Sequence, residues 1–343
     1  MQYLGLDLGT KTIVLARKGE DGRPVFRHEI NGFYAFDRVD GFVKNMLVKQ
    51  NVPSIERDGK IYALGKKAEE IAHAFNGVLR RPMSDGTVSK EPEAINIMAS
   101  IVHGIIGSLT KEETILYYCI PADALNQKTN VGLHQKIAQM IIEAKASEAK
   151  IRAYPINEAR AIAVGTGDAV AIAISWGAGM VNVCYAKFGI PIFEFSLVGS
   201  GDRVDIESAR AFGYDPNKPH EKSSETPTTI CKRKHSIDLT KPITDMDRVE
   251  QVIAMNYQLL IESVVQGIVD GFRNNADTAR FDGPIPIIMA GGTASPNGFG
   301  AYYEKVQKSK APLPFEVASV RVHERTLFAV AEGCLEAATL HVD

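Results

Sequence analysis

The chain has 343 residues, of which 45% are hydrophobic and 23% are charged, and its formal net charge is -2. This length predicts two or more domains, and the composition is typical of a soluble globular protein with a large core. A net charge so close to neutral gives no indication of binding to nucleic acid or to an acidic membrane surface.

The chain opens directly into a strand-like run at 3–6. It shows no basic segment, no apolar stretch and no cleavage site of the kind found in a signal peptide. This pattern is not that of a secretory signal peptide. No apolar run approaches the roughly 18 residues that a membrane-spanning helix needs. We therefore expect a cytoplasmic protein without a transmembrane segment.

Predicted strands and helices alternate through the first half of the chain. Strands at 3–8, 12–18 and 24–30 are separated by turns that contain glycine. Apolar residues at helical spacing predict a helix at 63–75. The same reasoning predicts a helix at 93–108, a strand at 115–120 and a helix at 124–146.

The second half repeats this alternation from residue 169 onward. The polar, proline-rich stretch 214–228 predicts an exposed loop. Elsewhere the patterns predict strands at 169–174, 181–185, 192–195 and 285–290, and helices at about 202–212, 247–275 and 325–340.

The cysteines are too far apart to suggest a metal site. No two of the four lie at metal-ligand spacing, and we expect reduced, buried or partly buried thiols. They are Cys119, Cys184, Cys231 and Cys334.

One short pattern occurs twice, 168 residues apart, which is close to half the chain. Leu4-Gly5-Leu6-Asp7-Leu8-Gly9 aligns with Ile172-Ala173-Ile174-Ser175-Trp176-Gly177, and each copy continues into a second strand. Because the same order of strands and helices follows each copy, we interpret the two as an internal repeat.

The turn that ends the first copy has the composition of a phosphate-binding hairpin. Gly9 allows a close approach, Thr10 and Thr12 supply hydroxyl groups, and Lys11 supplies a positive charge. Asp7 is placed to hold the water shell of a Mg²⁺ ion. The alternative is an ordinary tight turn in which Asp7 only caps a loop.

Two later segments supply further glycines of the same kind. The second hairpin, with Gly177, Ala178 and Gly179 at its tip, can also present backbone N–H groups. The predicted strand 285–290 runs into Gly291, Gly292 and Thr293, where a flat ring can approach the backbone. A strand that ends in two glycines is also a common tight connection, so this segment alone is weak evidence.

Together these residues resemble the superfamily of actin, DnaK-type chaperones and sugar kinases. The resemblance covers residues 4 to 338, and each of its five motifs occurs once, in the order typical of the superfamily. The motifs are the first phosphate loop at 5–10, a connecting helix at 157–165, the second phosphate loop at 175–180, an adenosine segment at 289–293 and a second connecting helix at 328–334.

The resemblance implies an α/β protein with an actin-like ATPase fold. Two related, ribonuclease H-like halves at 1–152 and 153–343 would hold a nucleotide in a cleft between them. Insertions at about 33–87 and 203–270 would bring the number of subdomains to four. Several shorter segments, among them Val52-Pro53-Ser54-Ile55 and Arg81-Pro82-Met83-Ser84-Asp85-Gly86, are similar to bacterial actins of the MreB/MamK type.

The resemblance also implies roles for individual residues. Gly201, Asp202 and Asp205 would lie beside the nucleotide, and Lys232 would line the adenosine, although a solvated basic face is the alternative for Lys232. Glu158 would orient the attacking water, or would simply be an acidic residue at a helix start.

The second phosphate loop departs from the superfamily pattern. Ser175, Met180 and Asn182 stand where the family has an aspartate, a threonine and an acidic residue. These changes leave phosphate binding possible and put hydrolysis in doubt. Trp176, in the same loop, fits packing better than stacking on a base.

The function implied by the resemblance is that of an actin-like cytoskeletal protein. It would bind ATP or ADP with Mg²⁺, polymerise head to tail with copies of itself and hydrolyse ATP slowly, without contacting nucleic acid directly. The cargo or adaptor protein is not identified by the sequence. Two alternatives are a nucleotide-binding regulator or scaffold that does not hydrolyse ATP, and a chaperone-like or other enzyme core of the same superfamily.

Overall fold

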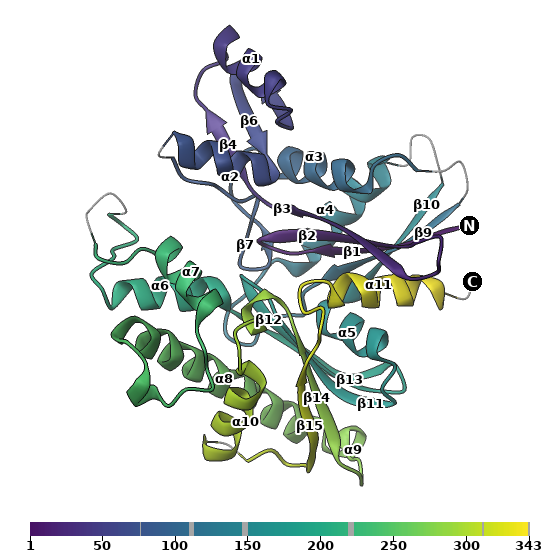
Figure 1. The fold of residues 1–343 in the computed structure, drawn as a ribbon. Coiled ribbons are helices and arrows are strands. Elements are labelled where there is room, and N and C mark those ends of the chain that lie inside the picture. The colour runs from purple at the N-terminus through teal and green to yellow at the C-terminus, as the bar shows by residue number, and fades with distance from the viewer. Residues whose placement is uncertain (76, 110–112, 146–149, 219–222, 311, 342–343) are drawn as a thin grey trace. The chain divides into compact units, whose positions relative to one another are not determined.

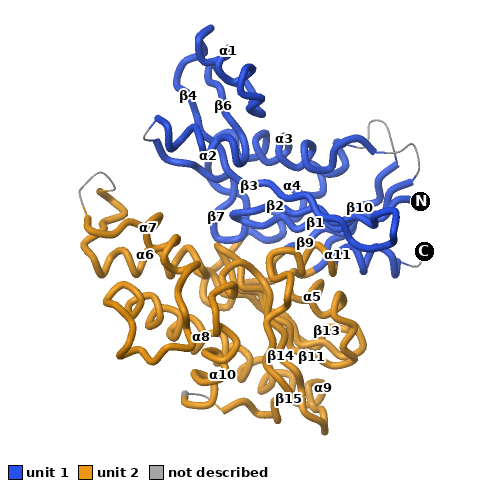
Figure 2. The backbone as a smooth tube through the Cα atoms, viewed as in Figure 1, with its two compact units in different colours: residues 1–120, 130–156, 334–343 blue, residues 121–129, 157–333 orange. Residues whose placement is uncertain are grey.

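The computed structural model describes residues 1–75, 77–109, 113–145, 150–218, 223–310 and 312–341. The chain divides into two compact units, shown in different colours in Figure 2. Unit 1 consists of residues 1–120, 130–156 and 334–343, and unit 2 of residues 121–129 and 157–333.

A five-stranded sheet forms the core of unit 1. Its strands lie in the order β10 (Ile151–Asn157), β9 (Thr114–Ile120), β1 (Gln2–Leu8), β2 (Thr12–Lys18) and β3 (Pro24–Ile30). The central strand β1 pairs in parallel with β9 and antiparallel with β2, and β2 pairs antiparallel with β3. The helices of this core are α3 (Ala94–Ile106) and α4 (Val131–Ala144).

A smaller sheet with its own apolar core interrupts unit 1 after β3. Strands β4 (Phe33–Phe36), β6 (Lys60–Leu64) and β5 (Ser54–Arg57) pair in that order. Helices α1 (Gly41–Lys49) and α2 (Gly65–Ala74) accompany them. Phe36, Leu47, Ile61 and Ile71 belong to the buried cluster of this insertion. A short hairpin of β7 (Met83–Ser84) and β8 (Thr87–Val88) follows.

Unit 2 contains a second five-stranded sheet with the same strand order. Its strands are β13 (Ile190–Val198), β12 (Met180–Lys187), β11 (Val170–Trp176), β14 (Ile285–Ala290) and β15 (Val317–Val322). As in unit 1, the first strand lies at the centre and pairs antiparallel with the second and parallel with the fourth. The internal repeat read from the sequence is therefore a repeat of topology.

The remaining elements of unit 2 are mostly helical. They are α5 (Glu158–Thr166), α6 (Gly201–Arg210), α7 (Pro227–Ser236), η2 (Ile243–Asp245), α8 (Arg248–Asn274), α9 (Ala276–Ala279), η3 (Gly292–Ala294), α10 (Phe299–Lys310) and α11 (Ala329–Thr339), whose last residues belong to unit 1 (Figure 1).

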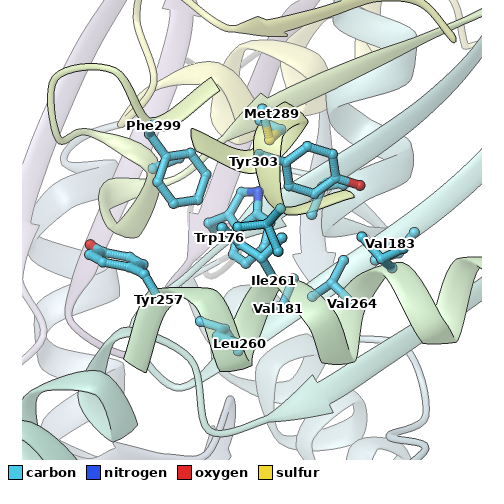
Figure 3. Close-up of a cluster of buried hydrophobic side chains, with 14 of the residues drawn as sticks. Trp176, Val181, Val183, Tyr257, Leu260, Ile261, Val264, Met289, Phe299 and Tyr303 are labelled. Atoms are coloured by element: carbon cyan, nitrogen blue, oxygen red, sulfur yellow. The ribbon is translucent and has the colours of Figure 1, made fainter. Parts of the chain in front are cut away.

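Trp176 lies at the centre of the apolar core of unit 2 (Figure 3). Its side chain is fully buried, and its ring packs edge-on against Phe299 and Tyr303, with centroids 5.1 and 6.2 Å away. The prediction that this tryptophan packs instead of stacking on a base is confirmed. Its burial also fixes the strand end from which the second hairpin begins.

The predicted helix at 124–146 begins later than expected, at Val131. Residues before it are held in an extended path along β13. Leu125 N donates to Ser196 O, and the Asn126 side-chain amide both donates to and accepts from the Val198 backbone. These contacts explain why 121–129 belongs to unit 2.

The C-terminal segment is joined to unit 1 through His341. Residues 334–343 belong to unit 1, where His341 Nδ1 lies 3.0 Å from the Tyr117 hydroxyl oxygen and the ring packs against Tyr154. The last helix begins at Ala329 instead of 325, and α2 begins at Gly65 because β6 continues through Leu64. The helix α7 was missed, because its basic, threonine-containing sequence has no clear apolar stripe.

Among the described residues, α8 is long and apolar enough to cross a membrane by length and composition, with a mean hydropathy of 1.4 over its best 18 residues. The prediction that no apolar run approaches the length of a membrane-spanning helix is therefore wrong for α8. Half of that stretch is buried inside the protein, and Ile253, Tyr257, Ile261 and Ile268 belong to the core of unit 2. This packing is that of a core helix.

Candidate functional site

The first hairpin turn is fastened to unit 1 through its carbonyl groups. Asn31 Nδ2 donates to Gly9 O at 3.0 Å, and Asn31 N donates to Lys11 O at 2.9 Å. Within the described part of the chain, the Thr10 amide donates to no other protein atom. The turn is thus anchored by its acceptors, which leaves a donor for a ligand.

Asp7, at the end of β1, lies against the thiol of Cys119 on the neighbouring strand. Cys119 Sγ donates to Asp7 Oδ1 at 3.1 Å and accepts from Leu8 N at 3.2 Å. None of the four cysteines forms a disulfide, in agreement with the predicted reduced thiols. Burial raises the pKa of Asp7 from 3.8 to about 6, and the Cys119 hydrogen bond acts in the opposite direction. The carboxylate is therefore destabilised without a cation beside it.

The second hairpin turn, in unit 2, is fastened by the same type of contact. Each of its three carbonyl oxygens accepts a hydrogen bond, while the Ala178 and Gly179 amides donate to no other described residue. The bonds are Thr293 Oγ1 to Gly177 O at 2.7 Å, Asp202 N to Ala178 O at 2.8 Å and Gly199 N to Gly179 O at 2.9 Å.

The two turns place the same steric demand on their first residue. A Cβ at Gly9 would lie 2.5 Å from Thr12 O, and a Cβ at Gly177 would lie 2.8 Å from Met180 O. Both pairs are related by the offset of 168, and both distances are too short for a side chain. Glycine at these positions is thus required by the turn itself.

Glu158 is held at the start of α5 by its neighbour and by Ser175. The Asn157 side chain caps the helix by accepting from Ala159 N at 2.9 Å and Arg160 N at 3.1 Å. Ser175 Oγ, at the end of β11, donates to Glu158 Oε2 at 3.0 Å. The serine that replaces the expected aspartate therefore orients the candidate catalytic carboxylate.

Met180 and Asn182, the other two departures, point into the protein. Met180 is 2% exposed, and Asn182 is fully buried, with its Oδ1 accepting from Ala122 N at 2.9 Å. Asn182 thus has a structural task in holding the segment after β9. Met180 has no polar group to offer, and Asn182 Nδ2 is buried without a hydrogen-bond partner among the described residues.

The two glycines after β14 have different tasks. Gly291 has a φ of 100°, and a Cβ there would lie 2.3 Å from Trp176 O, so the close approach of β14 to the hairpin requires glycine. A Cβ at Gly292 would meet no atom within 4 Å, so this residue borders open space. Thr293 joins the segment to the rest of unit 2, since its carbonyl accepts from Tyr257 Oη at 2.9 Å.

Beside Gly201 lies a cation that sequence reasoning missed. Lys234 is 3% exposed, and its Nζ lies 2.7 Å from Asp205 Oδ1 and donates to Gly201 O at 2.8 Å. Lys232, two residues earlier on α7, is exposed. Residues two apart on a helix do not share a face. The buried lysine was recognisable only once α7 and its inward face were known.

The predicted site residues fall into one group in each unit. Unit 1 holds Asp7 and the turn from Gly9 to Thr12. Unit 2 brings together Glu158, the hairpin tip, the start of α6 and the segment from Gly291 to Thr293, whereas Lys232 is only on the outer face of α7.

The residues present fit a nucleotide and a hydrated Mg²⁺ ion. Backbone amides without protein acceptors at the hairpin tips suit phosphate oxygens, and the open space at Gly292 suits a flat ring. No three His, Cys, Asp or Glu side chains converge within the described ranges. A single carboxylate such as Asp7 suits Mg²⁺ bound largely through water and phosphate.

Comparison with known proteins places this geometry in context. A family model described as Volactin matches residues 1–338. No curated protein matches the sequence. The chain is similar to the MamK double helical filament structure, with a TM-score of 0.71, 18% identity and 99% of each chain covered.

Two further solved structures are similar over nearly the whole chain. MreB5 of Spiroplasma citri bound to ADP has a TM-score of 0.65 and 16% identity, covering 97% of this chain and 94% of that one. The ethanolamine utilization protein EutJ from Carboxydothermus hydrogenoformans has a TM-score of 0.55 and 16% identity, covering 98% and 89%. At these identities the likeness shows the fold.

Proposed function

This chain belongs to the Volactin family and has the actin-like ATPase fold, and on that premise we propose that it binds Mg-ATP and assembles head to tail into filaments. We further propose that hydrolysis is slow. The proposal includes a cytoplasmic location and no direct contact with nucleic acid. The halves, the insertions and the nucleotide position between the halves stay predictions.

The repeated hairpin is the observation that carries the proposal. In both units a glycine without room for a side chain starts the turn, and protein donors occupy carbonyl groups of the turn. The amides of Thr10, Ala178 and Gly179 consequently remain as donors among the described residues. Such fixed donor sets bind phosphate oxygens with little reorganisation.

The unit 2 residues around Gly292 are the candidates for holding the base and ribose. Gly292 leaves room for a flat ring, while the buried pair of Lys234 and Asp205 fixes the start of α6 next to it. MreB5 was solved with ADP, which is a property of that protein. Its fold is shared here, and this supports an adenine nucleotide as the first ligand to test.

Glu158 is the proposed catalytic residue, and Ser175 positions it. Ser175 Oγ donates to one carboxylate oxygen, Oε2, and so orients the carboxylate that would accept from a water molecule. When bound, Mg²⁺ supplies positive charge that offsets developing charge on phosphate oxygens. Asp7 is the carboxylate that would hold its water shell. Met180 contributes no polar group, so turnover should fall well below the roughly 10 s⁻¹ typical of enzymes.

Self-association is the second part of the proposal. MamK, whose fold this chain shares, was solved as a double helical filament. A head-to-tail contact joins two different surfaces of the same chain, so it does not close and produces filaments. The insertions at about 33–87 and 203–270 are the segments that we expect to contribute to this contact. The cargo or adaptor that such filaments would serve is not identified by the residues.

The test combines binding, assembly and hydrolysis in matched samples. Isothermal titration with ATP, ADP and GTP in magnesium buffer should show ATP binding, and Asp7→Ala should weaken it. Sedimentation and electron microscopy with ATP, with ADP and without nucleotide should show nucleotide-dependent filaments, while phosphate release is followed in the same tubes. Absence of ATP and GTP binding at millimolar concentration would refute the proposal.

A scaffold that binds nucleotide without hydrolysing it is the second candidate. The buried Met180 favours it, because this side chain has no hydrogen-bonding group that could place a water molecule. Filaments that form with ATP and release no phosphate over hours would select this candidate. Binding without assembly under every nucleotide condition would instead indicate a monomeric regulator.

A further inference from the structure

Unit 1 contains a surface cavity of about 390 Å³ where its insertion meets its core. Leu64 and Gly65, at the junction of β6 and α2, line one side. Ile101, Gly104 and Ile105 of α3 line another, and the edge strand β3 contributes Arg27. Figure 1 shows α2, α3 and β3 together in this unit. The cavity contains none of the residues assigned to nucleotide binding.

The cavity floor is apolar and is kept open by a glycine. Leu64, Ile101 and Ile105 are each less than 9% exposed, so their contact surfaces are ordered by the fold. Gly104 lies within α3, and a Cβ there would meet no atom within 4 Å. Glycine weakens a helix relative to alanine, and packing does not require it here. Its missing side chain leaves room for a ligand.

The cavity rim carries one basic and one acidic side chain, Arg27 and Glu29, beside the polar side chains of His28 and Ser100. Arg27 is exposed, and across the described segments no carboxylate lies within ion-pair distance of its guanidinium. The neighbouring acid, Glu29, is already engaged, because its Oε1 accepts from Ile30 N at 2.8 Å and from Lys66 N at 2.7 Å. The Glu29 carboxylate is thus directed to the start of α2 and leaves Arg27 available.

We propose that this cavity binds a small anionic amphiphile, with an apolar body over Leu64, Ile101 and Ile105 and a carboxylate at Arg27. The volume lies near the lower end of the roughly 300–1,000 Å³ range of small-molecule pockets. In small-molecule sites a mostly apolar lining supplies contact area, and a small number of polar groups fix the orientation of the ligand. Here the apolar residues are Leu64, Ile101 and Ile105, and Arg27 is the polar group proposed to bind the anion. A planar guanidinium can bind a carboxylate through two hydrogen bonds.

A ligand in this cavity would link the insertion to the core of unit 1. The two parts are joined here by Gly65 N, which donates to Gly32 O at 2.9 Å, and by the Glu29 bond to Lys66. An occupant that contacts both sides reduces the freedom of this junction. Binding at the cavity depends on neither nucleotide nor filament formation, so it can be tested on the nucleotide-free chain.

The experiment uses octanoate as the probe, with octanol and octylamine as neutral and cationic counterparts of equal chain length. Spectra of full-length protein with ¹³C-labelled isoleucine and leucine methyl groups would report each titration, with Ile101→Val and Ile105→Val assigning the signals. Octanoate should shift the methyl signals of Ile101 and Ile105 saturably. Octanol should bind roughly two- to fivefold more weakly, as expected for loss of one exposed ion pair, and octylamine more weakly still.

Variants separate cavity binding from general adsorption. Gly104→Phe should fill the cavity and abolish all three shifts. The matched control is Gly132→Phe, another helical glycine with open space around it, which should leave binding unchanged. Arg27→Gln should remove the preference for octanoate over octanol while octanol still binds. Circular dichroism melting would establish that each variant is folded.

Three results would overturn the inference. They are no saturable shift with octanoate below its micelle concentration, equal binding by octylamine and octanoate, and unchanged octanoate binding in folded Gly104→Phe. If Arg27→Gln keeps the full preference for octanoate, the assignment of the anionic group to Arg27 is wrong. None of these results bears on ATP binding, which is measured separately.

Discussion

Ser175 Oγ donates a hydrogen bond to Glu158 Oε2 at 3.0 Å, which joins the end of β11 to the start of α5. The bond restrains the candidate catalytic carboxylate. The serine itself places a neutral group where the superfamily pattern has an aspartate. Ser175 is 2% exposed, so a charge placed there would be poorly hydrated.

Removing the Glu158 carboxylate should separate catalysis from binding. We expect Glu158→Ala to lower phosphate release at least about 10²-fold, because a water-orienting base would be lost, while ATP affinity changes less than about threefold. Single-turnover phosphate release and isothermal titration on the same preparation measure the two effects. Unchanged release in a folded Glu158→Ala variant would remove this residue from the catalytic role.

Placing the superfamily's aspartate at position 175 should destabilise the metal-free protein, because the Glu158 carboxylate lies beside it. Without metal, Ser175→Asp places a second carboxylate beside Glu158, so we expect a loss of about 1–3 kcal/mol in the free energy of unfolding at pH 7.5. The loss should shrink below about pH 5, where one carboxyl group is protonated. The control is Ser175→Asn, because asparagine has the shape of aspartate without its charge.

Magnesium should reverse part of that loss. We expect magnesium chloride to raise the midpoint of thermal unfolding of Ser175→Asp more than that of the wild type, at matched ionic strength set with sodium chloride. With ATP present, Ser175→Asp combined with Met180→Thr should hydrolyse faster than the wild type. An equal response of both proteins to magnesium would count against a metal beside position 175.

Asp7 should make stability depend on pH in the acidic range. Its pKa rises from 3.8 to about 6 in the folded chain through burial, so the folded state favours the neutral carboxyl. The stability associated with that neutral form is present below pH 3.8 and is lost as the pH rises through about 6. We expect Asp7→Asn to be more stable than the wild type above pH 6, by at most about 3 kcal/mol.

Denaturant unfolding between pH 4 and pH 8 would measure this difference. The difference in the free energy of unfolding between Asp7→Asn and the wild type should widen from pH 4 to pH 6 and then stay constant. Asp37→Asn, at an exposed side chain, should show no such gap. Parallel curves for Asp7→Asn and the wild type would mean that the carboxylate is not destabilised by the fold.

The hairpins could be predicted from the sequence because their requirements are local. The glycine at the start of each turn is required by a carbonyl three residues later, Thr12 O or Met180 O, so the constraint lies within a short stretch of chain. The offset of 168 then connected the two copies. The two sheets, whose strands lie in the same order, show that these copies open two units of the same topology.

Contacts between distant segments could not be predicted in the same way. Cys119 meets Asp7 only because β9 pairs in parallel with β1 in one particular register, with Leu6 beside Tyr118. The choice of Lys234 over Lys232 depends on which face of α7 turns inward. No periodicity indicates that register or that face, because both are set by the packing of elements far apart in the sequence.

The crossing of α5 and α11 should be intolerant of any side chain. A Cβ at Gly165 would lie 3.0 Å from Gly333 Cα, and a Cβ at Gly333 would lie 1.8 Å from Ala161 O. We expect Gly333→Ala to cost about 1–3 kcal/mol or more, because the two backbones must move apart. Gly132→Ala, at an open helical position, should be neutral or stabilising. Equal unfolding midpoints for both variants would disprove the close crossing.

Two lysines on α7 should differ in their contribution to stability, because only Lys234 forms the buried ion pair beside the second hairpin. Lys234 and Asp205 have side chains 4% and 8% exposed and lie 2.7 Å apart, so removing one charge leaves the other buried without its partner. We expect Lys234→Met to cost about 3–5 kcal/mol and to weaken nucleotide binding, because Lys234 Nζ also holds Gly201 O. Lys232→Met, at an exposed position of the same helix, should change stability by less than about 0.5 kcal/mol.

Lys234→Met combined with Asp205→Leu should recover much of the lost stability, since it removes the unpaired charge. Nucleotide binding should stay weak in this double variant if the pair serves the site. Chemical denaturation and ATP titration of these three variants give both readouts, and a large loss at Lys232 with none at Lys234 would reverse the assignment.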